Sequence, residues 1–341
     1  MHIIISVFSI EVNKKSIFNM YFIEMNGGIG KIEMLKKTNI LALVGGGKSP
    51  WFPPNNLIIW DDHQGKIISK LRFNENILNI RLRNDKIISI LQKKLYIFNL
   101  KTLETISIFD TFCNPSGIIG ISNGDNNKLI IAFPYESQGH VYVGNIISNK
   151  MEEISKISAH ESKIACLSVN KDGTILATSS DKGTIIRIFT TFGGVKFSEF
   201  RRGTKNVIMN CITFDQNNRF MGCTSNGGTL HIFSIIGIMN ILNENSNVNK
   251  KGNNNLEEEP KNSKSLLGKI GGFLNIKHSY LDSERNFARF KIQEPYSLLS
   301  FGNDNTFVVL TLDGKYYKAA YDPKKGGESC KIEEKNILED E

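Results

Sequence analysis

The sequence contains little cysteine, and its cysteines are not arranged in pairs. The five cysteines of the 341-residue chain are Cys113, Cys166, Cys211, Cys223 and Cys330. Because their number is odd and none belongs to a C-x-x-C pair, a disulfide framework and a zinc site are both disfavoured. Cys211, Cys223 and His231 are also too far apart along the chain for a compact zinc knuckle. We therefore expect no metal and no cofactor, and a reducing cytoplasmic compartment.

The sequence also lacks any long apolar run. Its start, Met1–Ile5, is apolar, but it has no basic region and no clear cleavage site, so we do not interpret it as a signal peptide. No run reaches the roughly 20 apolar residues that a transmembrane helix requires. We therefore expect any contact with a membrane to be peripheral.

Catalytic constellations are missing as well. The stretch Gly45–Ser49 resembles a phosphate-binding P-loop only superficially, because that motif requires a glycine where Ala42 stands and a helix where Pro50 follows. No Ser/His/Asp or Cys/His nucleophile arrangement emerges, and no paired carboxylates mark a cleft at strand ends. We therefore predict that the protein is not an enzyme.

Positive charge is in modest excess. The chain carries 42 Lys and Arg residues against 34 Asp and Glu residues, a formal net charge of +8. This balance favours an anionic partner, which can be a membrane surface, a nucleic acid or a phosphorylated ligand, although a merely soluble basic protein has the same composition. Aromatic residues are not interleaved with a basic stripe as single-stranded nucleic-acid binding requires. We therefore expect no nucleic-acid partner.

What the sequence does contain is a repeat. Short alternating runs end in pairs of large apolar residues, which are Ile59-Trp60, Ile97-Phe98, Val141-Tyr142, Ile188-Phe189, Ile232-Phe233 and Tyr316-Tyr317. The pairs recur about every 40–45 residues with several short strands in each repeat, which is typical of the blades of a β-propeller. The last interval is about one period too long, which indicates an insertion of roughly 40 residues. We therefore predict an all-β, propeller-type fold in a single domain over residues 1–341.

Two consecutive repeats can be divided into strands. In the first we expect strands at 164–169, 175–180 and 184–189 and a fourth that ends at 200; in the second we expect strands at 209–214, 220–225 and 229–233. Turn sequences separate them, among them Asp172-Gly173 and Asp181-Lys182-Gly183, in which glycine accepts a positive φ. Each repeat is therefore expected to be one antiparallel blade.

The insertion is predicted to occupy residues 236–286. Its middle, residues 243–264, is rich in Asn, Lys and Glu, a composition typical of disorder. Its later part has apolar residues near helical spacing, at Leu266, Leu267, Ile270, Phe273 and Leu274. With lysines nearby, these side chains suit the interface of a bilayer, so we expect them to insert into a membrane. The alternative is that this segment packs on its own blade.

The N-terminal part of the chain is short for a blade of four strands. We expect two strands there, around residues 3–12 and 17–25. The first blade is then incomplete, or is completed by the C-terminal strand expected within residues 328–338, or is cut by an incorrect start site.

Two adjacent arginines, Arg201 and Arg202, follow the alternating run 196–200. Because neighbouring side chains of a strand point to opposite faces, we expect their guanidinium groups to enter two different pockets. The planar fork of donors on each guanidinium suits a phosphate group. Hydroxyl and basic side chains cluster on both sides of the pair, at Thr178, Ser180, Lys182, Thr184 and Arg187 before it and at Thr224, Ser225 and Thr229 after it.

Two histidines occupy matching positions in consecutive repeats. His160 stands at the edge of the blade that leads to Arg201, and His231 lies one blade further on, near Arg202. Either histidine is equally consistent with a structural role, such as a hydrogen bond between blades. Only the clustering of polar residues around one arginine pair favours a binding site.

The sequence resembles the PROPPIN family of seven-bladed propellers that bind phosphoinositides. Three stretches carry the resemblance, namely Leu43-Val44-Gly45-Gly46-Gly47 with its continuation to Asp62, residues 159–189, and Phe200-Arg201-Arg202-Gly203, which looks like the family's lipid-binding motif. The resemblance implies a seven-bladed β-propeller whose first blade is incomplete here. It identifies the insertion as a loop of the sixth blade that dips into the membrane.

The resemblance further implies two head-group sites for phosphatidylinositol 3-phosphate and phosphatidylinositol 3,5-bisphosphate. It assigns His160, Ser180, Thr184, Arg187 and Arg201 to the first site, and Arg202, Ser225, Thr229 and His231 to the second. It implies a monomeric scaffold in autophagosome formation and endolysosomal membrane traffic, bound peripherally to phagophore, endosomal or vacuolar membranes. Its protein partner would be a lipid-transfer protein or a component of the conjugation machinery. The alternative is a lipid-independent WD-repeat scaffold for proteins.

Overall fold

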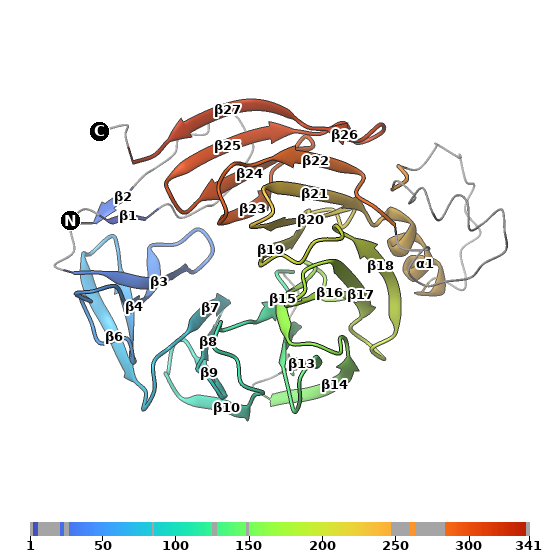
Figure 1. The fold of residues 1–341 in the computed structure, drawn as a ribbon. Coiled ribbons are helices and arrows are strands. Elements are labelled where there is room, and N and C mark those ends of the chain that lie inside the picture. The colour runs from blue at the N-terminus through green and yellow to red at the C-terminus, as the bar shows by residue number, and fades with distance from the viewer. Residues whose placement is uncertain are drawn as a thin grey trace. The chain divides into compact units, whose positions relative to one another are not determined.

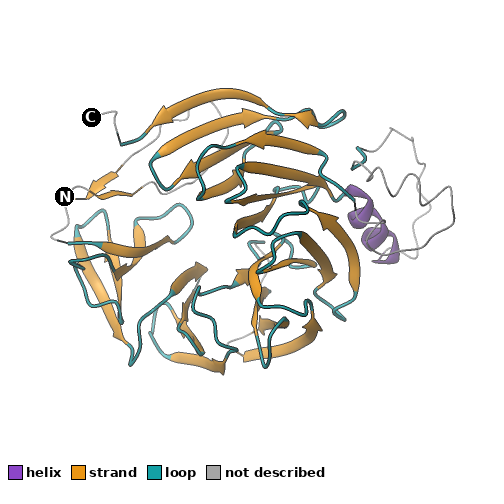
Figure 2. Cartoon of the chain, in the orientation of Figure 1, coloured by secondary structure: helices purple, strands orange, loops and turns teal. Residues whose placement is uncertain are grey.

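The computed structural model describes residues 3–5, 21–23, 27–83, 85–124, 128–147, 150–246, 260–262 and 284–338. Within these residues the chain forms 27 strands and one helix (Figures 1 and 2). Six sheets have four or five strands, and one sheet has two. The all-β composition predicted from the alternating runs is confirmed.

The chain divides into two compact units. The first contains residues 1–119, 133–137 and 145–153, and the second contains residues 120–132, 138–144 and 154–341. The strands of one sheet of the first unit are β3 (Ile29–Met34), β4 (Ile40–Gly45), β5 (Asn56–Asp61) and β6 (Lys66–Arg72). Those of the next are β7 (Asn79–Arg83), β8 (Lys86–Ile90), β9 (Lys94–Asn99) and β10 (Thr105–Asp110). In both sheets each strand pairs with the one that follows it in the chain.

A further sheet has residues assigned to both units. Its strands are β11 (Gly120–Ile121), β12 (Leu129–Pro134), β13 (His140–Ile147) and β14 (Lys150–Ser158), in that order. It repeats the plan of the two sheets before it, with four strands joined in sequence. The predicted repeat therefore runs through this part of the chain as well.

The second unit contains the two repeats that the sequence resolved best. The first of its sheets consists of β15 (Ile164–Val169), β16 (Ile175–Ser180), β17 (Ile185–Thr190) and β18 (Lys196–Arg201). The next consists of β19 (Met209–Phe214), β20 (Phe220–Ser225), β21 (Thr229–Ser234), β22 (Ala288–Lys291) and β26 (Gly327–Glu328). The last consists of β23 (Ser297–Phe301), β24 (Thr306–Thr311), β25 (Lys315–Ala320) and β27 (Cys330–Asn336).

The predicted strand positions in this unit agree with the structure to within about one residue. The turn between β16 and β17 shows why the sequence was informative. Gly183 has a φ of 62°, and a Cβ at this position would lie 2.3 Å from the carbonyl oxygen of Val207. Only glycine fits both the positive φ and this close approach of two backbones.

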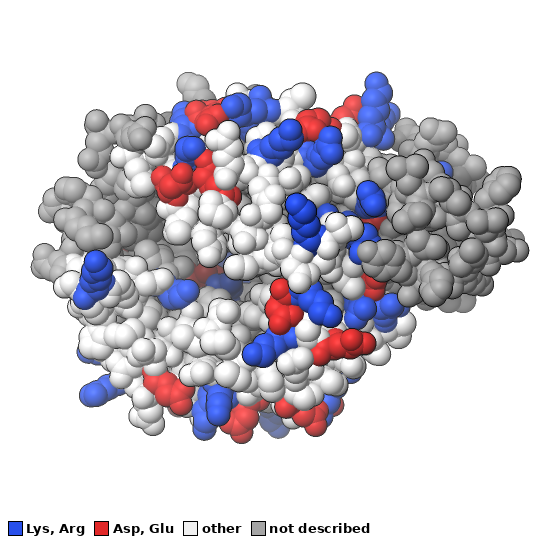
Figure 3. Space-filling model, viewed as in Figure 1, with Lys and Arg blue, Asp and Glu red and all other residues white. Residues whose placement is uncertain are grey.

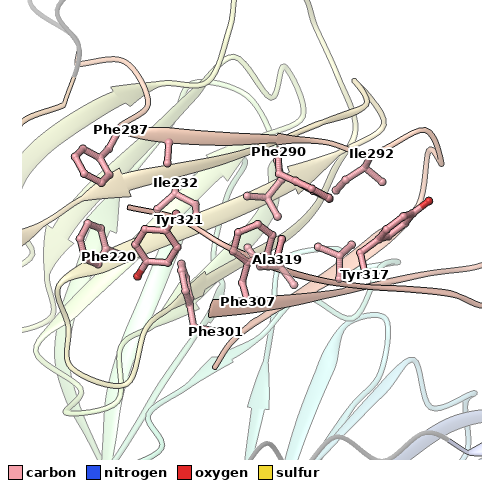
Figure 4. Close-up of a cluster of buried hydrophobic side chains, with 14 residues drawn as sticks. Phe220, Ile232, Phe287, Phe290, Ile292, Phe301, Phe307, Tyr317, Ala319 and Tyr321 are labelled. Carbon is pink, nitrogen blue, oxygen red and sulfur yellow. The ribbon is translucent and has the colours of Figure 1, made fainter. Parts of the chain in front are cut away.

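Burial differs between the inner and outer strands of each blade. The second strands β16 and β20 are buried at every position, whereas the outer strand β18 is buried only at Phe200 and Arg201. In the last two sheets, aromatic rings fill the space between strands (Figure 4). The rings of Phe220 and Tyr321 lie 5.0 Å apart in an edge-on arrangement, which adds to the stabilisation from area burial alone.

The insertion begins with a helix that the sequence did not predict. Helix α1 (Ile236–Ser246) follows β21 directly and packs Ile238, Met239 and Leu242 against the core that contains Phe200 of β18 (Figure 1). The five side chains predicted to enter the membrane, Leu266, Leu267, Ile270, Phe273 and Leu274, lie outside the described residues. Their role stays a prediction.

The two ends of the chain form strands where the sequence placed them. β1 (Ile3–Ile5) and β2 (Tyr21–Ile23) pair with each other in a two-stranded sheet. The C-terminal strand β27 pairs with β25 as the outer strand of the last sheet. Of the alternatives for the first blade, completion by pairing with the C-terminal strand is therefore not the one observed.

Candidate functional site

The last residue of β18 is Arg201, and Arg202 follows directly after it. On the strand, Arg201 lies opposite Ile185 of β17. The chain then turns, and the N–H groups of Arg202 and Gly203 donate to the carbonyl oxygen of Thr184 at 2.9 and 3.3 Å. Arg201 is 8% exposed, whereas Arg202 is only partly buried. The two neighbouring arginines therefore have different surroundings.

The side chain of Arg202 reaches toward the sheet that follows β18. Its Nε donates to the carbonyl oxygen of Gly183 at 2.8 Å, and its Nη2 donates to that of Lys205. A Cβ on Gly227 would lie 3.4 Å from Nη1 of Arg202 and 3.3 Å from Oγ of Ser225. Arg202 and Ser225 thus come together beside the turn between β20 and β21.

Two more residues of the second predicted site lie on β21. Thr229 is the first residue of this strand, is partly buried and lies opposite Lys291. His231 lies opposite Cys223 on one side and Arg289 on the other. Burial, and then the positive charge of Arg202, lower the pKa of His231 to about 4. His231 is therefore neutral at pH 7, and the charge of Arg202 acts directly on its ring.

The first predicted site is crossed by a row of polar side chains. A hydrogen bond of 3.0 Å joins Nε2 of His160 to Oγ1 of Thr178, and Thr178, Arg187 and Glu199 lie opposite one another on β16, β17 and β18. His160 is 6% exposed. Burial, and then the charge of Arg187, lower the pKa of His160 to about 4. His160 is therefore a neutral, buried member of this row.

Arg187 already has partners within the protein. Its Nε donates to Oε2 of Glu199 at 2.9 Å, and its Nη1 donates to the carbonyl oxygen of Ala159 at 2.7 Å. The remaining members, Ser180 and Thr184, flank the turn after β16, where Ser180 is buried and Thr184 is partly exposed. A ligand at this site would therefore meet Arg187 as part of an ion pair.

Sequence reasoning missed three polar residues around these positions. Glu199 is two residues before Arg201, and the alternation of β18 was a sufficient signal to find it. Glu284, whose carbonyl oxygen accepts the N–H of Arg201 at 2.7 Å, and Asn286, which interacts with the ring of His231, stand more than 50 residues further along the chain. Local sequence gave no signal for these two contacts.

Charges of both signs are mixed on the face shown in Figure 3, where Asp and Glu lie among Lys and Arg. Within the described part of the chain, no three His, Cys, Asp or Glu side chains are grouped to hold a metal ion. In the same residues, no helix has the length and apolar character needed to cross a membrane.

The five cysteines are free thiols. In the second unit Cys223 is buried and Cys166 is partly buried, and burial raises the pKa of Cys223 to about 12. Such thiols remain protonated at neutral pH and are poor nucleophiles. The prediction that the chain contains no disulfide framework agrees with this arrangement.

Successive four-stranded antiparallel sheets of this kind define the β-propeller class. The model of the PROPPIN family matches residues 48–338. Autophagy-related protein 18 of Yarrowia lipolytica is 30% identical, and the match covers 94% of this chain and 90% of the relative. Autophagy-related protein 18 of Dictyostelium discoideum is 29% identical, with 94% and 86% covered. The chain therefore belongs to the PROPPIN family.

Solved structures have a similar fold. Kluyveromyces lactis Hsv2 has a TM-score of 0.68 at 19% identity, with 93% of this chain and 89% of that chain covered. A complex of KlAtg21 with the coiled-coil of AgAtg16 gives the same TM-score and identity, with 96% and 89% covered. At such low identity the likeness shows the fold alone, and it confirms the propeller fold predicted from the repeat.

Proposed function

We propose that the protein is a peripheral membrane effector that binds phosphatidylinositol 3-phosphate and phosphatidylinositol 3,5-bisphosphate. Two head-group sites would flank the motif Phe200–Gly203, the first around Arg201 and the second around Arg202. The observation that carries the proposal is the different environment of these two adjacent arginines. Membership of the PROPPIN family, with relatives named as autophagy-related proteins, supports it.

The second site has the chemistry that a phosphate needs. Arg202 is fixed by carbonyl oxygens at Nε and Nη2, so its remaining Nη1 is directed to the turn that also carries Ser225. A fixed guanidinium loses little conformational entropy when it binds an anion. Charge-assisted hydrogen bonds of this kind are about twice as strong as neutral ones.

The first site would operate differently. Arg187 can serve a phosphate only by sharing its guanidinium with Glu199 or by leaving that ion pair. Its five donors allow sharing, because Nε and Nη1 are the atoms with partners inside the protein. Neutral His160 supports the row through Thr178 without adding charge.

Two weak sites on one rigid protein bind a membrane much more tightly than either site alone. The second binding event is intramolecular, and the overall affinity for the membrane rises on the order of a hundredfold. Insertion of the apolar residues between Leu266 and Leu274 would add to this retention. In this scheme tight binding requires both the correct lipid head group and the presence of a membrane.

Flotation of liposomes tests the proposal. The wild type should float with vesicles that contain phosphatidylinositol 3-phosphate and not with vesicles that lack phosphoinositides. The double variant R201T/R202T should stay in the soluble fraction, with its folding checked by circular dichroism. Flotation of the double variant at the wild-type level would overturn the proposal.

We further infer a non-catalytic scaffold role in autophagosome formation and endolysosomal membrane traffic. The protein would associate with phagophore, endosomal or vacuolar membranes and recruit a protein partner from the autophagy machinery. The solved complex of KlAtg21 with a coiled-coil makes a coiled-coil segment the first partner class to test. The competing function is a lipid-independent protein scaffold. Full partner recovery by R201T/R202T in the absence of membranes would favour that alternative.

A further inference from the structure

Asn262, in the middle of the insertion, is hydrogen-bonded to Ser234 at the end of β21. The N–H of Ser234 donates to Oδ1 of Asn262 at 2.7 Å, and Nδ2 of Asn262 donates to the carbonyl oxygen of Ser234 at 2.8 Å. The side-chain amide thus pairs with Ser234 as a peptide group of a neighbouring strand would. Nδ2 also donates to Oε2 of Glu284 at 2.7 Å. Both hydrogens of the amide nitrogen therefore have acceptors.

Glu284 in turn contacts the Arg201 end of β18. Its carbonyl oxygen accepts the N–H of Arg201 at 2.7 Å, and Glu284 forms a parallel bridge with Phe200. β18 is the outer strand of its sheet, so among the described residues its outward N–H groups face no further strand of that sheet. The hydrogen bond from Glu284 is thus made at the residue that carries the first candidate guanidinium.

The residues after Glu284 continue along the second site. The N–H of Phe287 donates to the carbonyl oxygen of Ile232 at 2.7 Å, and Asn286 interacts with the ring of His231. Helix α1, at the other end of the insertion, packs on the core that contains Phe200. Both ends of the insertion are therefore attached beside the arginine pair.

We propose that Asn262 and Glu284 are positioning residues for the first head-group site. The Asn262–Glu284 hydrogen bond holds the carbonyl of Glu284 against the N–H of Arg201, and this contact fixes the backbone from which the Arg201 side chain departs. The inference rests on the proposed function, because it assigns Arg201 to a phosphate. Binding groups lose efficiency when their support is loosened by as little as about 1 Å.

The variant Asn262→Asp tests the proposal without changing the shape of the side chain. Aspartate has no donor, so its carboxylate would face the carbonyl oxygen of Ser234 and the carboxylate of Glu284. Calorimetry with soluble inositol 1,3-bisphosphate should show affinity reduced roughly five- to tenfold. Hydrogen exchange at the Arg201 amide should become faster. Asn217→Asp, the same chemical change on the exposed turn between β19 and β20, should match the wild type.

The soluble head group separates positioning from simple anchoring of the insertion. If N262D binds vesicles more weakly but binds inositol 1,3-bisphosphate like the wild type, Asn262 only anchors the insertion and the proposal is overturned. If N262D does not fold, Glu284→Ala and Glu284→Gln take its place. E284Q keeps an acceptor oxygen for Asn262 and should bind more tightly than E284A, whereas equal, wild-type affinities would overturn the proposal.

The proposed function and this inference fail in different ways. If the wild type binds neither inositol 1,3-bisphosphate nor phosphatidylinositol 3-phosphate vesicles, the proposed function fails. Hydrogen exchange at the Arg201 amide then still tests whether Asn262 and Glu284 hold the backbone of Arg201. If the wild type binds, R201T weakens binding and N262D retains it in full, the proposed function stands and only the positioning role is wrong.

Discussion

The guanidinium of Arg187 is ion-paired with Glu199 across β17 and β18, with Nε 2.9 Å from Oε2. Both side chains are mostly buried, with exposures of 27% and 19%. The pair lies in the row that begins at His160, inside the first proposed head-group site. The site proposed to receive a phosphate thus contains the negative charge of Glu199. Removing this charge should change the affinity of the site for a phosphate.

Replacing Glu199 by glutamine should strengthen binding of inositol 1,3-bisphosphate several-fold. The amide keeps an acceptor for Arg187 but removes the charge that repels a phosphate. Calorimetry measures the affinity, and Glu333→Gln, the same change on β27, serves as the control. Weaker binding by E199Q would instead mean that the carboxylate is needed to orient Arg187.

Single replacements of the two arginines should each leave part of the membrane binding intact. With two independent sites, R201T and R202T should each weaken vesicle binding by roughly tenfold, and the double variant by at least about a hundredfold. Titration of liposomes against labelled protein gives these values. A single variant as defective as the double variant would indicate one shared site.

Acid should destabilise the protein through His160 and His231. His160 and His231 have a pKa of about 4 in the folded protein, against 6.5 as their ordinary value. Below pH 6.5 the unfolded chain therefore takes up protons that the folded protein does not. The contribution of the two histidines to the free energy of unfolding is present in full above pH 6.5. It is lost as the pH falls from 6.5 to 4, by up to about 3 kcal/mol for each histidine.

Denaturant unfolding as a function of pH measures this loss. The variant His160→Gln should show a smaller decrease between pH 6.5 and 4 than the wild type, whereas His63→Gln at an exposed position should not. An unchanged slope in H160Q would contradict the assignment of this pH dependence to His160.

Replacing Gly183 by alanine should lower stability by about 1–3 kcal/mol. The new Cβ would meet the carbonyl oxygen of Val207 at 2.3 Å, and the positive φ would be strained. Gly237→Ala in α1 is the matched control, because nothing lies within 4 Å of its Cβ position and alanine favours a helix. Equal melting temperatures of the two variants would contradict the prediction.

Replacing Glu294 by alanine should destabilise the last sheet. Glu294 is 7% exposed, accepts a hydrogen bond from Lys315 Nζ at 2.6 Å, and is contacted by the hydroxyl of Tyr317 at 3.2 Å. Its loss leaves the buried hydroxyl of Tyr317 without this acceptor, at a cost of about 2 kcal/mol. Glu328→Ala, which breaks the exposed pair with Arg289, should change the melting temperature little. A larger loss of melting temperature in E328A than in E294A would contradict the prediction.

Strand positions and the arginine pair were predictable because both depend on local chemistry. Alternating apolar residues and Asp-Gly turns mark β15 to β21 directly, since a strand exposes successive side chains to opposite faces. The resemblance to the PROPPIN family groups Ser225 with Arg202, and the structure brings both beside the turn between β20 and β21. Helix α1 was not predicted, because its apolar residues are followed at once by an Asn-rich segment typical of disorder.

By itself the sequence determined the repeat, the all-β class and the separation of Arg201 from Arg202, all of which follow from side-chain periodicity and backbone turns. Only the tertiary structure decided which residues surround each arginine. The ion pair of Arg187 with Glu199 depends on strand register, and the contact of Glu284 with Arg201 depends on a segment that returns from the insertion between β21 and β22. Such long-range pairings are set by packing of the whole unit, and no local pattern encodes them.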